Sequence, residues 1–113
     1  GDPMLEILKT NYFRGKTLLV AEKDGHINLE HAFKMLLREG IQSILIEAGP
    51  TLASTLIREH LVDKLELFIA PKLLGNGQKA VHGLNINRMS EILEFRKSTW
   101  TSVGPDMLLT AWI

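Results

Sequence analysis

The feature that most constrains the fold is an alternation of short apolar runs and helical patterns in the first half of the chain. The runs at 17–21 and 43–46 are short and almost continuously apolar, as expected of strands covered on both faces. Helical patterns follow them at 29–39 and 52–60. Strand, helix, strand and helix in succession predict parallel pairing through right-handed crossovers.

The helix predicted over 29–39 has start and stop signals at its ends. Asn28 is a plausible N-cap, and Gly40 is a natural C-terminal stop. Before the helix, Asp24-Gly25 predicts a turn. Apolar residues recur between the helix ends at the 3.6-residue period of a helix with one buried face: Leu29, Ala32, Phe33, Leu36 and Leu37.

The second half of the chain changes pattern. Apolar and other residues alternate over 65–69, which predicts a strand, and the glycine-rich stretch 72–90 predicts an irregular loop. Two further strands, 91–100 and 107–113, flank a Gly-Pro-Asp turn at 104–106 and predict a hairpin. We therefore expect an α/β fold with a mostly parallel sheet, helices on its faces and a C-terminal antiparallel hairpin.

Composition narrows the class of protein. The 113 residues suit one domain or part of one. Lys plus Arg and Asp plus Glu both number 13, so there is no cationic surplus for nucleic acid, and we expect no such partner. The absence of cysteine excludes disulfides and thiolate metal sites, and it fits a reducing cytoplasm. The histidines show no metal-ligand spacing, so we expect no metal. No apolar run reaches the roughly 18 residues of a membrane helix, and the first residues lack a signal-peptide pattern.

One segment, 44–51, combines features of a ligand site. A hydrophobic run ends at Glu47, the small residues Ala48 and Gly49 follow, and a helix begins near Pro50. Ligands of open α/β sheets bind at the carboxyl ends of strands, and free N–H groups at a helix N-terminus attract phosphate. Small residues and proline are also good helix starts for structural reasons alone, so this pattern leaves both interpretations open.

Three sequence blocks follow one another over residues 47–75. They are Glu47-Ala48-Gly49-Pro50-Thr51-Leu52, Leu61-Val62-Asp63-Lys64-Leu65 and Ile69-Ala70-Pro71-Lys72-Leu73-Leu74-Gly75. In order and spacing these blocks resemble a known family, the reductase domain of the bifunctional riboflavin-biosynthesis deaminase/reductase. Val103-Gly104-Pro105-Asp106 resembles its last turn.

The resemblance implies a dihydrofolate-reductase-like, three-layer α/β/α fold and a homodimer. It implies reduction of 5-amino-6-(5-phosphoribosylamino)uracil to the ribitylamino compound in riboflavin biosynthesis, with NADPH as hydride donor. Glu47 would lie beside the ribose of this phosphoribosylamino-pyrimidine, although a solvated carboxylate at a strand end is the plainer alternative. The residues implied to hold the NADPH phosphates are Gly49, Pro50, Thr51, Leu52, Ala53, Ser54 and Thr55. No catalytic residue is assigned.

The resemblance covers only part of the family's pattern. The zinc-deaminase signature, His-x-Glu with a later Pro-Cys-x-x-Cys, is absent, so we expect no deaminase domain here. The family's reductase domain is longer, and its N-terminal half supplies much of the substrate-phosphate site. Residues 1–113 are therefore interpreted as the C-terminal part of a reductase domain, with exposed sheet edges that favour dimerisation.

Other interpretations remain open at this stage. The first is a non-catalytic dimerisation or nucleotide-binding fragment of the same reductase, inactive without the N-terminal half. The second is a related reductase acting on another pterin or pyrimidine. A flavodoxin-like domain is weaker, because residues 22–28 offer only Gly25 for a glycine-rich loop.

Overall fold

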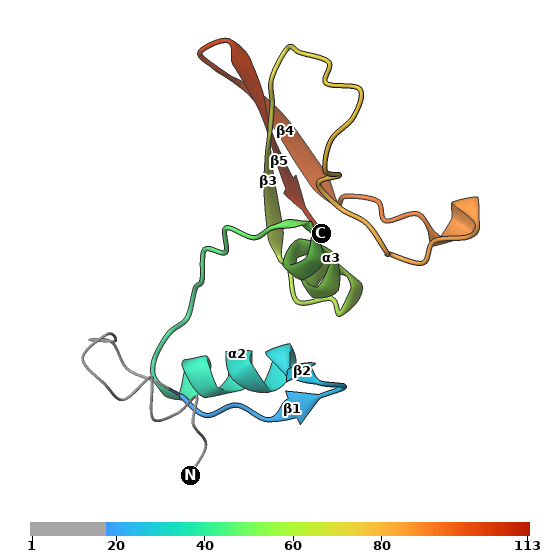
Figure 1. The fold of residues 1–113 in the computed structure, drawn as a ribbon. Coiled ribbons are helices and arrows are strands. Elements are labelled where there is room, and N and C mark those ends of the chain that lie inside the picture. Colours follow the sequence, from blue (N-terminus) through green and yellow to red (C-terminus); the bar gives the residue numbers. More distant parts are fainter. Residues whose placement is uncertain (1–17) are drawn as a thin grey trace. The chain divides into compact units, whose positions relative to one another are not determined.

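The computed structural model describes residues 18–113. The chain divides into two compact units, Gly1–Leu45 and Ile46–Ile113. The first unit contains β1, β2 and α2, and the second contains α3, β3, η1, β4 and β5 (Figure 1).

In the described part of the first unit, β1 (Glu22–Lys23) and β2 (His26–Ile27) form a small antiparallel hairpin. Asp24 and Gly25 have φ values of 53° and 79°, and two successive left-handed residues are what a tight hairpin turn needs. The turn predicted at Asp24-Gly25 is thus confirmed.

The strand predicted over 17–21 is wrong for residues 18–21, and residue 17 lies outside the described residues. The physical reason is that both backbone polar groups of Ala21 form hydrogen bonds with nearby residues of the same chain segment. Its carbonyl accepts the Asn28 N–H (2.8 Å between N and O), and its N–H donates to Nδ1 of His31 (2.9 Å). Ladder bonds to a neighbouring strand would need those same two groups.

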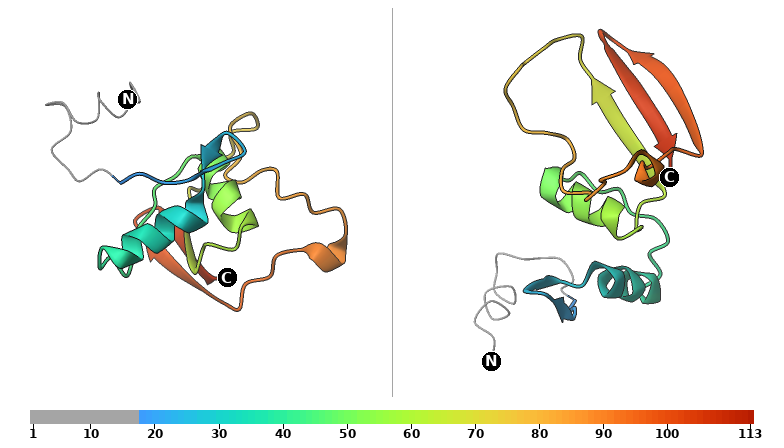
Figure 2. Two further views of the ribbon diagram at one scale, coloured as in Figure 1. Left: turned by 90° about the horizontal axis from the view of Figure 1, so that it is seen from below. Right: turned by 90° about the vertical axis from the view of Figure 1, so that its right-hand side faces the viewer.

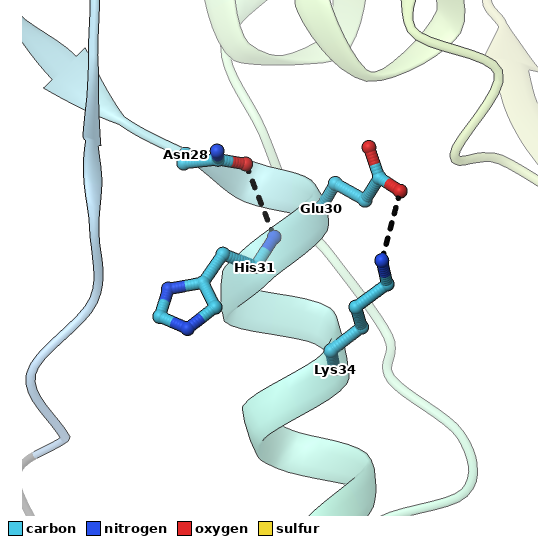
Figure 3. A network of polar contacts seen from close by, with 4 residues as sticks. All are labelled: Asn28, Glu30, His31 and Lys34. Atoms are coloured by element: carbon cyan, nitrogen blue, oxygen red, sulfur yellow. Dashed lines mark hydrogen bonds and ion pairs between the residues drawn. The ribbon is translucent and has the colours of Figure 1, made fainter.

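Helix α2 (Leu29–Arg38) confirms the helix predicted over 29–39. The side chain of Asn28 accepts a hydrogen bond from the His31 N–H at 3.1 Å, which satisfies one of the free donors of the first turn (Figure 3). Glu30 and Lys34 form an exposed ion pair at 3.2 Å one turn apart (Figure 3). Such pairs contribute only a few tenths of a kcal/mol, roughly 0.3–0.5.

The C-terminus of α2 closes with a glycine in the left-handed region. Gly40 has φ 87°, its N–H donates to the Leu37 carbonyl, and the Ile41 N–H donates to the Leu36 carbonyl. This pair of bonds is the Schellman motif, so the stop predicted at Gly40 is confirmed. No residue of α2 is fully buried. On its apolar face Leu29, Ala32, Phe33 and Leu36 are partly exposed, and Leu37 is exposed.

The second unit is built on a three-stranded antiparallel sheet of order β3-β5-β4. Strand β3 (Lys64–Ile69) and strand β4 (Lys97–Val103) lie on either side of β5 (Asp106–Trp112). The strand predicted over 65–69 and the C-terminal hairpin are confirmed. The first hairpin strand begins at residue 97 rather than 91, because a 3-10 turn, η1 (Met89–Glu91), and a connecting stretch precede it.

At the end of the sheet away from the β4–β5 turn, two lysine side chains contact the ring of Trp112. Lys64 and Lys97 both pair in register with Trp112. Their ammonium nitrogens lie 5.5 and 5.1 Å from the Trp112 ring centroid. Cation–π attraction at this range adds about 0.5–1 kcal/mol at an exposed site, which strengthens the pairing of all three strands.

The mostly parallel sheet predicted from the sequence is not seen in residues 18–113, where both sheets are antiparallel. The run at 43–46 is extended but forms no strand, and Leu45 is 83% exposed. An apolar run becomes a strand only when a neighbouring strand takes up its backbone groups, and no described strand does so.

Helix α3 (Pro50–Arg58) begins two residues before the helix predicted over 52–60. Its Leu56 and Ile57, together with Ala111 of β5, are the buried apolar residues of the described chain. The predicted irregular loop 72–90 leaves the end of β3 and returns to α3 before η1 (Figure 2). The buried core is small, and many large apolar side chains remain exposed.

Candidate functional site

The candidate site is the turn that leads into α3. Gly49 is the N-cap, with φ −70° and ψ 174°, and no side chain caps this helix. The Ala53 N–H donates to the Gly49 carbonyl at 3.0 Å, which is the first bond of the helix. The N–H groups of Thr51 and Leu52 precede that bond, and Pro50 has none. The N-terminus of α3 therefore offers backbone N–H donors to an acceptor outside the helix.

In the described structure, neither the backbone conformation nor the packing at residue 49 requires a glycine. The negative φ of Gly49 is open to any residue, and an added Cβ would meet no atom within 4 Å. Within residues 18–113, a side chain at this position would cause neither backbone strain nor a steric clash. Glycine also permits a bound group to approach the backbone closely.

The hydroxyls of the second helical turn are already engaged. Ser54 is 1% exposed, and its Oγ donates to the Pro50 carbonyl (2.5 Å) and accepts from the His82 N–H (2.8 Å). Thr55 is half-buried, and its Oγ1 donates to the Thr51 carbonyl at 2.9 Å. These side chains shape the helix start, whereas the exposed Thr51 hydroxyl is free to face a ligand.

The predicted site residues form one continuous stretch of the second unit. Glu47 and Gly49 are exposed, and the apolar Leu52 of the first turn is 41% exposed. Sequence reasoning missed the two long-range contacts that this helix makes, from Ser54 to His82 and from Arg58 to Gly83. A serine amid the apolar residues of the inner face was the available signal, but its partner lies 28 residues away.

A shallow hollow lies at the opposite end of α3. Its volume is about 170 Å³, and Arg58, His60 and Glu91 give it polar groups beside an apolar lining of Ile57, Leu84, Ile86 and Leu93. None of the predicted cofactor-binding residues lines it. Within residues 18–113, no His, Asp and Glu side chains gather as metal ligands, and no helix is long and apolar enough to cross a membrane.

Comparison with known proteins decides the family. The sequence matches the family described as the RibD C-terminal domain over residues 5–109. The chain belongs to this family. It is 39% identical over 95 residues to the riboflavin biosynthesis protein RibD of Escherichia coli. It is 33% identical over 96 residues to a protein of Buchnera aphidicola named 5-amino-6-(5-phosphoribosylamino)uracil reductase.

The chain is much shorter than these RibD relatives. The match spans 83% of this chain but 26% of the E. coli protein, and 46% of the Buchnera reductase. Among solved structures, Acinetobacter baumannii RibD matches with a TM-score of 0.68 at 29% identity, covering 78% of this chain and 26% of that one. This likeness fits a dihydrofolate-reductase-like α/β fold.

Proposed function

We propose that this RibD C-terminal domain chain is part of a cytoplasmic, NADPH-dependent reductase of riboflavin biosynthesis. The reductase would convert 5-amino-6-(5-phosphoribosylamino)uracil into 5-amino-6-(5-phosphoribitylamino)uracil. One observation carries the proposal: the family motif at 47–52 coincides with the uncapped N-terminus of α3. The printed name of the Buchnera relative supports the reaction.

The start of α3 would hold the cofactor phosphates. The backbone N–H groups of Gly49, Thr51 and Leu52 would donate to phosphate oxygens, and the helix dipole adds attraction for negative charge. Pro50 fixes the entry angle of the helix. The remaining members of the proposed stretch, Ala53, Ser54 and Thr55, shape the first two turns beneath it. When bound, NADPH would supply the hydride.

Glu47 would act on the substrate side of the same turn. It is exposed and lies only two residues before the N-cap, so a bound ribose could reach both groups. Its carboxylate would accept hydrogen bonds from sugar hydroxyls and guide the proton movements of ring opening. The remaining contribution is alignment of donor and acceptor carbons.

The small buried core supports the interpretation of residues 1–113 as part of a reductase domain. We propose that the complete domain adds strands beside the run at 43–46, which then becomes a central strand of a mostly parallel, three-layer α/β/α sheet. Its exposed apolar side chains favour a homodimer. They equally favour the alternative, a non-catalytic dimerisation or nucleotide-binding fragment.

The test is to titrate the full-length protein with NADPH and with NADH by calorimetry, and then to add the phosphoribosylamino-pyrimidine and follow NADPH oxidation. Saturable NADPH binding with turnover is the expected result, and it excludes the non-catalytic alternative. Binding without turnover in the full-length protein supports that alternative. No binding at millimolar cofactor contradicts the proposal.

A further inference from the structure

The second unit contains a partly buried polar contact that joins α3 to the loop 72–90. Ser54 is the largest fully buried side chain in residues 18–113. Its hydroxyl bridges two backbone groups, accepting from the His82 N–H and donating to the Pro50 carbonyl. One side chain thereby connects the first residue of α3 with a loop residue far along the chain.

A second contact holds the neighbouring loop residue. The Arg58 guanidinium donates through Nη1 to the Gly83 carbonyl at 2.9 Å, and its Nη2 lies 3.5 Å from the Thr55 hydroxyl. Ser54 and Arg58 are one turn apart on α3, and they hold consecutive loop residues, His82 and Gly83. Because two successive loop residues are held at two points along α3, the contacts fix the direction of the loop as well as its position.

We propose that Ser54 and Arg58 are positioning residues that clamp loop residues 82–83 onto α3 and so keep the cofactor turn in its binding geometry. This inference rests on the proposed function. Ser54 then acts through Pro50 and the loop and does not touch the cofactor, because its hydroxyl is buried and both of its partners are protein groups. Arg58 is exposed and supplies the weaker half of the clamp.

The link to cofactor binding runs through Pro50. Its carbonyl accepts the Ser54 hydroxyl, so the residue beside the N-cap Gly49 is held from within the helix. A hydroxyl that bonds back to the carbonyl four residues earlier also adjusts the bend of a helix. Removing it leaves the His82 N–H without its protein partner, so the loop must move or admit water. The donors of Thr51 and Leu52 would lose their fixed direction.

The test compares four forms of the full-length protein: unsubstituted, Ser54→Ala, Arg58→Gln and the control His82→Ala. The control keeps the backbone N–H that Ser54 contacts. We expect Ser54→Ala to raise the KM for NADPH about tenfold, with kcat and the substrate KM within about twofold. Arg58→Gln should shift the NADPH KM the same way by about threefold, and His82→Ala should match the unsubstituted protein.

A purely structural role gives a different pattern. Loss of stability alone lowers the active fraction, and hence kcat, while the surviving molecules keep their NADPH KM; that result in Ser54→Ala overturns the inference. Rescue of the NADPH KM by Ser54→Thr, which restores a hydroxyl, supports it. If Ser54→Ala fails to fold, Arg58→Gln decides, because its side chain is exposed. An unchanged NADPH KM in that variant then overturns the clamp.

Hydrogen exchange separates this inference from the proposed function. Faster exchange of the amides of residues 80–84 in Ser54→Ala supports the clamp without reference to any ligand, and unchanged exchange overturns it. If the unsubstituted protein binds no NADPH, the proposed function fails, and the claimed effect on the cofactor fails with it. The exchange rates then still decide whether Ser54 holds the loop.

Discussion

Helices α2 and α3 end in the same way but begin differently. Both close with a Schellman motif, α2 at Gly40 and α3 at His60, whose φ is 59°. In α3 the His60 N–H donates to Ile57, and the Leu61 N–H donates to Leu56. Both C-termini are therefore closed by local backbone hydrogen bonds, a common way to satisfy the last carbonyls of a helix.

The two N-termini show the difference. The Asn28 side chain caps α2, and Glu30 adds a negative charge to its first turn (Figure 3). Helix α3 starts at Gly49 with no side-chain cap and no acidic residue in its first turn. A capped helix with an acidic first turn is less attractive to an anion, whereas an uncapped helix start without acidic residues leaves its donors and its dipole available. The comparison distinguishes a structural helix from one suited to a ligand.

The largest expected effect comes from giving α3 the cap that α2 has. Gly49→Asp would place a carboxylate on the free donors, so NADPH affinity should fall about 100-fold through competition and charge repulsion. Calorimetric titration measures this. Asn28→Asp is the matched control, since it changes only the cap of α2 and should leave the affinity unchanged. Unchanged binding in Gly49→Asp would place the phosphates elsewhere.

The next effect concerns the carboxylate before the α3 turn. Glu47→Gln keeps the shape of the side chain but removes its charge, so kcat/KM for the substrate should fall about tenfold while the NADPH dissociation constant changes little. Steady-state kinetics and titration of the full-length variant check this. Equal losses in both quantities would show that Glu47 has a structural role in the turn.

The shared C-terminal motif can be broken at Gly40. Gly40→Ala puts a Cβ on a residue with φ 87°, which should lower the free energy of opening of α2 by about 1–2 kcal/mol. Hydrogen exchange of the α2 amides reports this local opening. Gly40→Asn, which tolerates the left-handed region better, should cost less. Equal effects of the two substitutions would contradict the backbone explanation.

The α2 cap can be removed as well. Asn28→Ala leaves the His31 N–H without its side-chain acceptor, which should cost about 1 kcal/mol of local stability. The same exchange measurement applies, with Asn28→Ser as the variant that retains a cap. If Asn28→Ala and Asn28→Ser exchange alike, the cap is not what holds the start of α2.

The smallest effect is a gain in stability. His60→Gly relieves a left-handed non-glycine residue at the end of α3, so opening of this helix should become less favourable by about 0.5–1 kcal/mol. Slower exchange of the α3 amides is the expected result. NADPH affinity should stay the same, because the substitution lies at the helix end opposite Gly49.

Local patterns were sufficient for much of the fold. Asn28 and Gly40 mark the ends of α2 because caps are set by residues next to the helix. Strand β3 and the final hairpin follow from alternation and turn residues. The run at 43–46 was predicted wrongly as a strand, because strand formation depends on a neighbour that the run itself cannot specify. The predicted start of α3 was two residues too late, because proline is well suited to the first position of a helix and Pro50 occupies it.

The sequence by itself determined the family motif, the position of Glu47 before a glycine turn, and the helix that follows. Only the tertiary structure decided that Gly49 leaves its helix uncapped and that Ser54 faces inward toward His82. The physical reason is the separation along the chain of the residues that interact. Caps, turns and periodicity are interactions between near neighbours in the chain. Burial of a hydroxyl against a loop 28 residues away depends on how the whole unit packs.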